Sequence, residues 1–167
     1  MATQRRDLIE HAKLCDVSKR YEEMTKVLDS IVAAVPKTQG LTAEERKLLA
    51  IAYKNLLTPR RRSWKLLENG VKSRDLNSTH KNLVKSYRTS IADEIKELCQ
   101  KLIEMVDKKL IPTVSEPESD IFYHKLRGDY YRYMAEVEED PVTVAEYVNM
   151  IQDNYQGRLL MFQQDKW

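Results

Sequence analysis

The stretch YKNLLTPRRRSWKLL, residues 53–67, decides the class of fold that this chain can adopt. Its apolar residues recur at spacings of three and four, which is the period of an amphipathic α-helix. The pattern begins after Thr42 and Glu45, whose T-x-x-E spacing predicts a capping box at a helix start. It continues to about Gly70, so the stretch predicts one helix of about 30 residues with Pro59 and three consecutive arginines inside it.

Helical patterning extends over nearly the whole chain. Further helices are predicted over about residues 3–16, 17–35, 80–110 and 117–138, and from residue 141 to a stop at Gly157. Glycine and proline are scarce, at 4 and 5 residues among 167, whereas 32% of the residues are charged. Such a composition favours long helices over a sheet protein with many turns. We therefore expect an all-α fold, an antiparallel array of about six helices.

Charge and hydropathy exclude two classes of partner. The 28 basic and 26 acidic side chains leave a net charge of only +2, so any positive patch is local and no nucleic-acid partner is expected. No segment approaches the roughly 18 to 20 apolar residues that cross a bilayer, and no membrane association is expected. The first residues, MATQRRDLIEHAK, lack the apolar core of a signal peptide, which favours a cytoplasmic location.

Motifs of catalysis and of metal binding are missing from the sequence. It contains no P-loop, Rossmann glycine motif, H-E-x-x-H, G-x-S-x-G or EF-hand loop. We interpret His11, His80 and His124 as solvated or hydrogen-bonded helix residues, and Cys15 and Cys99 as reduced thiols. The sequence therefore predicts neither an enzyme, nor a metal site, nor a cofactor.

Positive charge does gather beside the apolar stripes. Lys54 and Arg61 are two helical turns apart and so project from one face, and Lys125 and Arg132 share the same spacing. Tyr133 follows Arg132 directly. Two arginines, a lysine and a tyrosyl hydroxyl brought together from two helices would hold a dianion, because guanidinium groups match phosphate oxygens two at a time.

Spacing alone leaves a second interpretation open, in which these cations are surface residues paired with nearby carboxylates. Asp129 lies four residues after Lys125 and three before Arg132, within reach of either.

Longer motifs narrow the choice, because their order and spacing over about residues 5–137 resemble the N-terminal helices of the 14-3-3 family. The motifs are SKRYEEM (18–24), RKLLAIAYKNL (46–56), PRRRSW (59–64), LIP (110–112) and FYHKLRGDYYRYMAE (122–136). The family is all-α, dimeric and cytosolic, and binds phosphoserine or phosphothreonine segments of many proteins. The resemblance implies that Lys54, Arg61, Arg132 and Tyr133 form the phosphate pocket, and that Lys125 lines the groove beside it.

The resemblance also implies a dimer, either of two copies or with another chain of the family. Leu14, Arg20, Tyr87 and Glu94 stand at positions of the family's dimer interface, where Arg20 and Glu94 would pair across it. Ser63 follows the three arginines and resembles the family's interface serine, whose phosphorylation loosens dimers. It is therefore predicted as a regulatory phosphosite.

For residues 138–167 we find no counterpart in the family. We divide the single domain into residues 1–137, with the pocket and dimerisation helices, and a helical tail over 138–167. The later of the family's nine helices supply the groove's apolar wall, and this chain is expected to lack them. Three outcomes remain open: a pocket that still binds phosphopeptides, a dimerising or regulatory scaffold subunit that binds none, or a tail that replaces the wall or exchanges between subunits.

Overall fold

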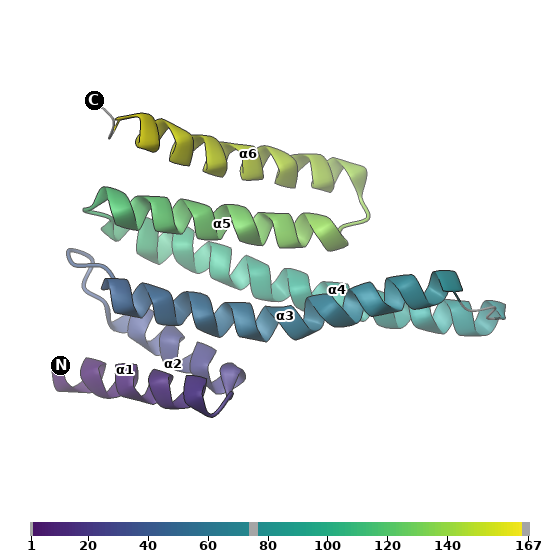
Figure 1. Cartoon of the computed structure of the whole chain (residues 1–167), viewed down its shortest axis with the longest axis horizontal. Coiled ribbons are helices and arrows are strands. Elements are labelled where there is room, and N and C mark those ends of the chain that lie inside the picture. The colour runs from purple at the N-terminus through teal and green to yellow at the C-terminus, as the bar shows by residue number, and fades with distance from the viewer. Residues whose placement is uncertain (1, 74–76, 165–167) are drawn as a thin grey trace.

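The computed structural model describes residues 2–73 and 77–164, and within them it contains helices and no strand (Figure 1). The helices are α1 (Ala2–Val17), α2 (Tyr21–Ala34), α3 (Ala43–Ser73), α4 (Ser78–Met105), α5 (Pro117–Val137) and α6 (Pro141–Gln164). A π-helical turn (Val106–Leu110) and a 3-10 turn (Ile111–Thr113) follow α4. The predicted all-α class and the six helices are confirmed.

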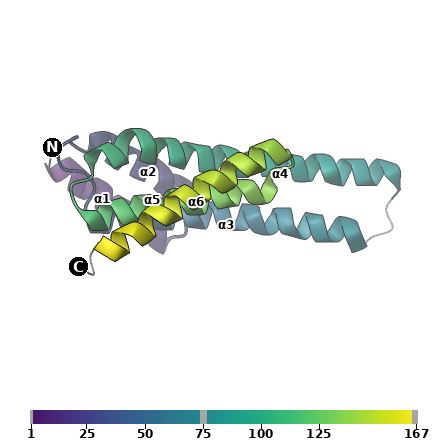
Figure 2. The same cartoon turned by 90° about the horizontal axis from the view of Figure 1, so that it is seen from above.

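Each helix packs against the next one in the chain. Figure 1 shows the helices stepping from α1 at one edge to α6 at the other, with the far ends of α3 and α4 projecting beyond the rest. In Figure 2, α6 lies over α5 and crosses it obliquely. α4 packs against both α3 and α5, and an ion pair between Arg61 and Glu136 joins α3 to α5.

The core follows the predicted apolar stripes. Fully or almost fully buried side chains include Leu28, Leu49, Tyr53, Ile95 and Leu102, from α2, α3 and α4. Burying one side chain of this size contributes about 1.5 to 3 kcal/mol. The stripes therefore fix which face of each helix is turned inward and which remains free for binding.

The start of α3 is held by the predicted capping box. The Thr42 amide donates to Glu45 Oε1 at 2.8 Å, and the Glu45 amide donates to Thr42 Oγ1 at 3.2 Å. Arg5 of α1 adds two bonds to the same carboxylate, Nε to Oε2 at 2.8 Å and Nη2 to Oε1 at 2.6 Å. Burial alone would raise the pKa of Glu45, but the bonds from Arg5 and Thr42 lower it. This buried ion pair ties α1 to α3.

Two predicted boundaries differ from the structure. The helix expected from residue 17 begins only at Tyr21, because Lys19 adopts a positive φ of 61° that closes α1 in a tight turn. The predicted stop at Gly157 is wrong, since α6 continues to Gln164. A single helical glycine costs only about 1 kcal/mol relative to alanine, which need not end a helix. The turn predicted between α3 and α4 includes residues 74–76, which lie outside the described part.

The tail packs on its own chain. Gly128 of α5 lies beneath α6, and a Cβ atom added to it would stand 2.8 Å from Cε1 of Tyr155 and 3.3 Å from Cβ of Asn154. The two helices can approach this closely only because residue 128 has no side chain. None of the described helices is both long and apolar enough to cross a membrane.

Candidate functional site

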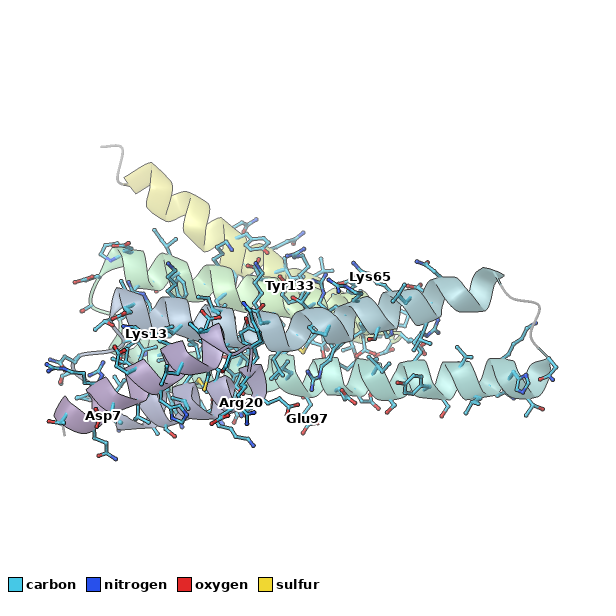
Figure 3. The ribbon with its side chains drawn as sticks, turned by 60° about the horizontal axis from the view of Figure 1, so that its bottom comes forward. Asp7, Lys13, Arg20, Lys65, Glu97 and Tyr133 are labelled. Carbon is cyan, nitrogen blue, oxygen red and sulfur yellow. The ribbon has the colours of Figure 1, made fainter. Side chains whose placement is uncertain are left out.

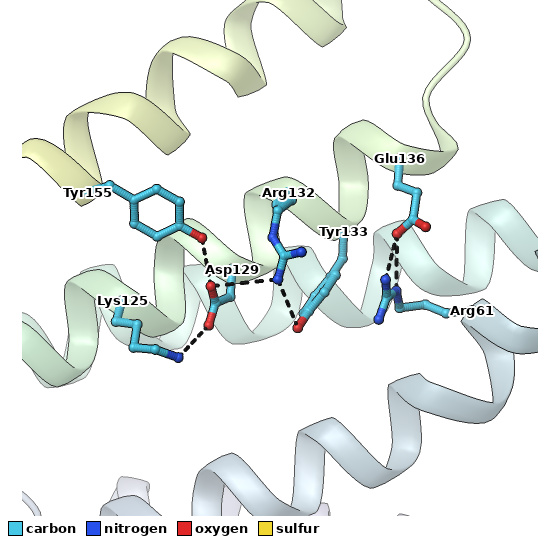
Figure 4. Close-up of polar contacts among 7 residues, drawn as sticks. All are labelled: Arg61, Lys125, Asp129, Arg132, Tyr133, Glu136 and Tyr155. Carbon is cyan, nitrogen blue, oxygen red and sulfur yellow. Dashed lines mark hydrogen bonds and ion pairs between the residues drawn. The ribbon is translucent and has the colours of Figure 1, made fainter.

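A cavity of about 190 Å³ lies between α3 and α5. Lys54, Thr58 and Arg61 line it from α3. The other lining residues come from the same two helices and are Ala50, Leu57, Phe122, Lys125, Leu126, Asp129, Tyr130 and Tyr133. Four of the five residues predicted for binding thus meet in one cavity. Arg132, the fifth, lies beside Tyr133 at its edge (Figure 4).

The Tyr133 ring brings the two arginines together. The guanidinium carbon of Arg61 lies 4.2 Å from the ring centroid, and that of Arg132 lies 4.9 Å from it. Both separations fall within the range of cation–π attraction. Arg132 Nη2 is also 3.5 Å from the Tyr133 hydroxyl. Two guanidinium groups and a phenolic hydroxyl therefore converge from different helices.

Glu136, which the sequence analysis did not single out, is the ion-pair partner of Arg61. Its Oε2 accepts from Arg61 Nη2 at 2.8 Å and from Arg61 Nε at 3.2 Å, while its Oε1 lies 2.9 Å from Lys65 Nζ. Burial alone would raise the pKa of Glu136, but the hydrogen bonds from Lys65 and Arg61 lower it. The carboxylate is therefore ionised at neutral pH and holds Arg61 in place.

Asp129 organises the other end of the site. It lies 2.9 Å from Lys125 Nζ and 3.9 Å from Arg132 Nη2, which confirms the pairing that spacing suggested. Its Oδ1 also accepts a 2.7 Å bond from the Tyr155 hydroxyl of α6. Burial and this hydrogen bond raise the pKa of Tyr155, so the hydroxyl keeps its proton and acts as the donor. The tail thus supports the site.

Positive charge exceeds negative charge around this cavity. Lys54, Arg61, Lys125 and Arg132 are faced by the carboxylates Asp129 and Glu136. Within the described residues, Lys54 forms no ion pair of its own. With Lys65, the second partner of Glu136, five cations face two carboxylates, so the group keeps a surplus of positive charge that a bound dianion would largely neutralise.

The Tyr130 hydroxyl is a further polar atom of the site. Tyr130 lines the cavity, is 3% exposed, and its hydroxyl finds no hydrogen-bond partner among the described residues. Buried hydroxyls are normally hydrogen-bonded to protein or to ordered water. The hydroxyl oxygen itself is shielded from solvent, so it is an unsatisfied buried polar atom next to the cavity.

The cavity opens into a longer groove. A second hollow of about 540 Å³ shares Ala50, Lys54, Phe122 and Lys125 with it and continues between the same helices. Its further lining includes the apolar side chains Ala43, Ile51 and Ile121. Arg46, Lys47 and Glu118 also line this continuation, so the groove combines apolar side chains with charged ones on both helices.

A separate hollow of about 520 Å³ lies at the start of α3 and is lined by Arg5, Arg46, Glu116 and Glu118, among others. Its arginines are already engaged, Arg5 by Glu45 and Arg46 by the Leu41 carbonyl. This hollow is larger than the cavity between α3 and α5, but it has no comparable surplus of positive charge.

The residues predicted for a dimer interface lie elsewhere. Leu14 and Tyr87 are exposed, at 67% and 59%. Within this chain Arg20 pairs with Glu23 at 2.6 Å, and Glu94 pairs with Arg60 at 3.2 Å. In Figure 3, Arg20 lies on the opposite side of the molecule from Lys65 and Tyr133.

The remaining arginines of the run lie outside the cavity lining, and Arg60 is half-buried and pairs with Glu94 and Glu22. Arg62 is exposed, and the exposed Ser63 hydroxyl donates to the Pro59 carbonyl at 3.0 Å.

Comparison with known proteins decides the family. The family model for 14-3-3 protein matches residues 11–165. The chain belongs to the 14-3-3 family. It is 40% identical over 139 residues to 14-3-3 protein 6 of Solanum lycopersicum, an alignment that covers 81% of this chain and 54% of that protein. It is 36% identical over 137 residues to 14-3-3 protein zeta of Bombyx mori, covering 82% of this chain and 54% of the relative.

The chain spans about half the length of the curated relatives it matches. The match to the 14-3-3 family model also continues past Val137 to residue 165, and so includes most of the tail for which the sequence suggested no counterpart.

Sequence reasoning missed Glu136 and Tyr155 as parts of the site. Glu136 lies four residues after Arg132 on α5, a helical neighbour of the predicted pocket residues, so its position was a usable signal. Tyr155 had no such signal, because its contact depends on how α6 crosses α5.

Proposed function

We propose that this chain is a non-catalytic adaptor that binds phosphoserine or phosphothreonine segments of other proteins in the cavity between α3 and α5. The observation that carries the proposal is the surplus of positive charge gathered around Tyr133 at the basic end of an amphipathic groove. Membership of the 14-3-3 family supports the same role. We place this activity in the cytoplasm.

In the proposed complex the phosphate takes hydrogen bonds from Arg61, Arg132, Lys54 and the Tyr133 hydroxyl. A guanidinium group can donate two parallel bonds to phosphate oxygens. Each hydrogen bond to a charged group contributes about 1.5 to 3 kcal/mol net, so a few such bonds support micromolar binding even after the cost of ordering the peptide.

Lys125 and Tyr155 act in support. Asp129 holds the Lys125 ammonium at the cavity, where it faces the groove that the rest of the peptide follows. Tyr155 holds Asp129, so α6 fixes the carboxylate that orients both Lys125 and Arg132. The tail thereby stiffens the pocket in advance of binding.

The proposal includes a dimer, formed with a second copy or with another 14-3-3 chain. The exposed apolar side chains Leu14 and Tyr87 would be buried in it, and Arg20 would exchange Glu23 for the partner's Glu94. Exposed ion pairs contribute only about 0 to 1 kcal/mol, so the apolar residues would supply most of the stability. We expect Leu14→Glu to raise the monomer fraction in analytical ultracentrifugation; an unchanged fraction would contradict this interface.

Ser63 is the proposed regulatory site. A phosphate on its exposed hydroxyl would add close to two negative charges beside Arg60 and Arg62. We expect Ser63→Glu to weaken self-association in the same ultracentrifugation experiment, relative to Ser63→Ala.

The pocket is tested by fluorescence anisotropy with a labelled, arginine-rich phosphoserine peptide. Arg61→Ala and Arg132→Ala are each expected to weaken binding by about 10- to 150-fold, equivalent to about 1.5 to 3 kcal/mol. Arg62→Ala is the matched control, because Arg62 is an adjacent exposed arginine outside the cavity.

Equal loss in all three variants would mean that the peptide senses only general positive charge, and would sink the pocket assignment. Dimerisation without any affinity for the phosphopeptide would favour the other role suggested by the sequence, a regulatory scaffold subunit.

A further inference from the structure

Three side chains of different chemistry meet where α1 turns into α2. The ligand-type atoms of His11, Cys15 and Glu23 all lie within 4.8 Å of one another. His11 Nε2 and Glu23 Oε1 are 3.2 Å apart. The sequence had suggested no metal spacing for either His11 or Cys15, since Glu23 comes from a different helix.

The local fold explains the meeting. His11 and Cys15 are four residues apart on α1 and therefore lie on one face of that helix. Lys19 then adopts a positive φ of 61°, and the Arg20 amide donates to the Cys15 carbonyl at 2.9 Å. This tight turn returns the chain so that the first turn of α2 places Glu23 beside the last turns of α1.

We propose that His11, Cys15 and Glu23 form a binding site for a borderline-soft divalent cation of the Zn²⁺ type. Imidazole nitrogen, thiolate sulfur and carboxylate oxygen are the three ligand classes that Zn²⁺ uses, and a water molecule would complete the tetrahedron. The inference goes beyond the adaptor role and does not depend on it.

Distances and charges both suit such an ion. Bond lengths of about 2.0 to 2.3 Å in a tetrahedral site put neighbouring ligand atoms about 3.3 to 3.6 Å apart. The His11–Glu23 separation already matches this value, so only adjustments on the order of 1 Å are needed elsewhere. One thiolate and one carboxylate would balance the two charges of the ion.

Access and competition also permit binding. The side chains of His11 and Glu23 are 49% and 40% exposed, whereas Cys15 is 3% exposed beneath them. Arg20 bonds Glu23 through Oε2 and leaves Oε1, the oxygen next to His11, for the ion.

The test is a titration of the full chain, kept reduced, with Co²⁺ followed by Zn²⁺. A thiolate bound to Co²⁺ gives a charge-transfer absorption band that imidazole and carboxylate ligands alone do not give. We expect one Co²⁺ per chain, a charge-transfer band, and displacement of the Co²⁺ by Zn²⁺.

Matched variants assign the ligands. Cys15→Ala should abolish the band and Cys99→Ala should keep it, because Cys99 is a buried cysteine outside the cluster. His11→Ala should weaken Co²⁺ binding by at least about tenfold, with His80→Ala as the control. No band in the unaltered chain, or an undiminished band in Cys15→Ala, would overturn the proposal. If Cys15→Ala does not fold, the exposed substitution His11→Ala decides, and unchanged affinity there would equally overturn it.

Discussion

Two arginine–glutamate pairs in this molecule differ in what surrounds them. Arg5 spreads its bonds over both oxygens of Glu45, whose side chain is fully buried. Arg61 places both of its bonds on one oxygen of Glu136, whose side chain is 27% exposed and whose other oxygen faces Lys65. The first pair is closed, with each charge matched to one partner, whereas the second is open and shares its carboxylate between two cations.

The difference separates structure from function. Around Glu45 the remaining donor, the Thr42 amide, belongs to the α3 capping box, so the pair serves the fold. The cavity next to Glu136 contains more positive than negative charge, so an incoming anion can also form ion pairs with its cations. A closed pair is expected to matter for stability, and an open pair for ligand binding.

The largest expected effect is on the closed pair. Glu45→Ala removes the capping box and leaves Arg5 without its partner, which should lower the free energy of unfolding by about 2 to 4 kcal/mol. Urea denaturation measures this value. Glu44→Ala is the control, because Glu44 is an exposed neighbour that pairs with Lys13, and it should cost less than about 1 kcal/mol. Equal losses of unfolding free energy in Glu45→Ala and Glu44→Ala would contradict a special structural role for the closed pair.

A slightly smaller effect is expected where α6 meets the open site. Gly128→Ala would drive a methyl group into the Tyr155 ring, and overpacking of this kind costs about 1 to 3 kcal/mol. The same change should weaken phosphopeptide binding, because Tyr155 holds Asp129. At Gly70 an added Cβ meets nothing within 4 Å, so Gly70→Ala should be neutral or stabilising by up to about 1 kcal/mol. A harmless Gly128→Ala would show that the tail does not support the pocket.

Removing the negative charge of Glu136 from the open pair should strengthen phosphopeptide binding, in contrast to Gly128→Ala. Glu136→Gln leaves the shape of the site but frees Arg61 and Lys65 from a competing carboxylate. We expect phosphopeptide affinity to rise by about two- to tenfold in anisotropy titrations, at little cost in stability. Glu139→Gln, a nearby exposed substitution whose partner is Arg88, should leave the affinity unchanged. Weaker binding by Glu136→Gln would mean that the carboxylate positions Arg61 for the ligand and does not compete with it.

The smallest expected effect is a difference between the two pairs in how the free energy of unfolding changes at acid pH. The pKa of both glutamates is lower in the folded chain than the ordinary value of 4.5. Their stabilisation is therefore fully present above about pH 4.5 and is lost as the pH falls through the folded values. Glu45 is the more deeply buried of the two. The dependence of the unfolding free energy on pH across this range should therefore decrease more in Glu45→Gln than in Glu136→Gln. The reverse ranking would contradict the assignment of the structural role to Glu45.

Much of the structure around the closed pair (Arg5–Glu45) and the open pair (Arg61–Glu136) could be predicted from local sequence. Thr42 and Glu45 mark the start of α3 through a four-residue motif, and the seven-residue spacing of the cations places each pair on one helical face. The resemblance to 14-3-3 proteins came from sequence motifs, and the family comparison confirms the family.

The remaining contacts depend on distant parts of the chain. Arg5 and Glu45 are 40 residues apart, and Arg61 and Glu136 are 75 apart. No local period predicts which helices will lie side by side, so these partners emerge only from the packed structure. The cluster at the α1–α2 turn is an intermediate case, because the four-residue spacing of His11 and Cys15 was visible whereas the turn at Lys19 that adds Glu23 was not.

The most direct measurement is an anisotropy titration of the full chain with the labelled phosphoserine peptide and its unphosphorylated twin. The surplus of positive charge around Tyr133 predicts that the phosphorylated peptide binds at least about tenfold more tightly, and that added salt reduces the difference. Equal affinity for the two peptides would contradict the account, because it would mean that the open arginine–glutamate pair does not recognise phosphate.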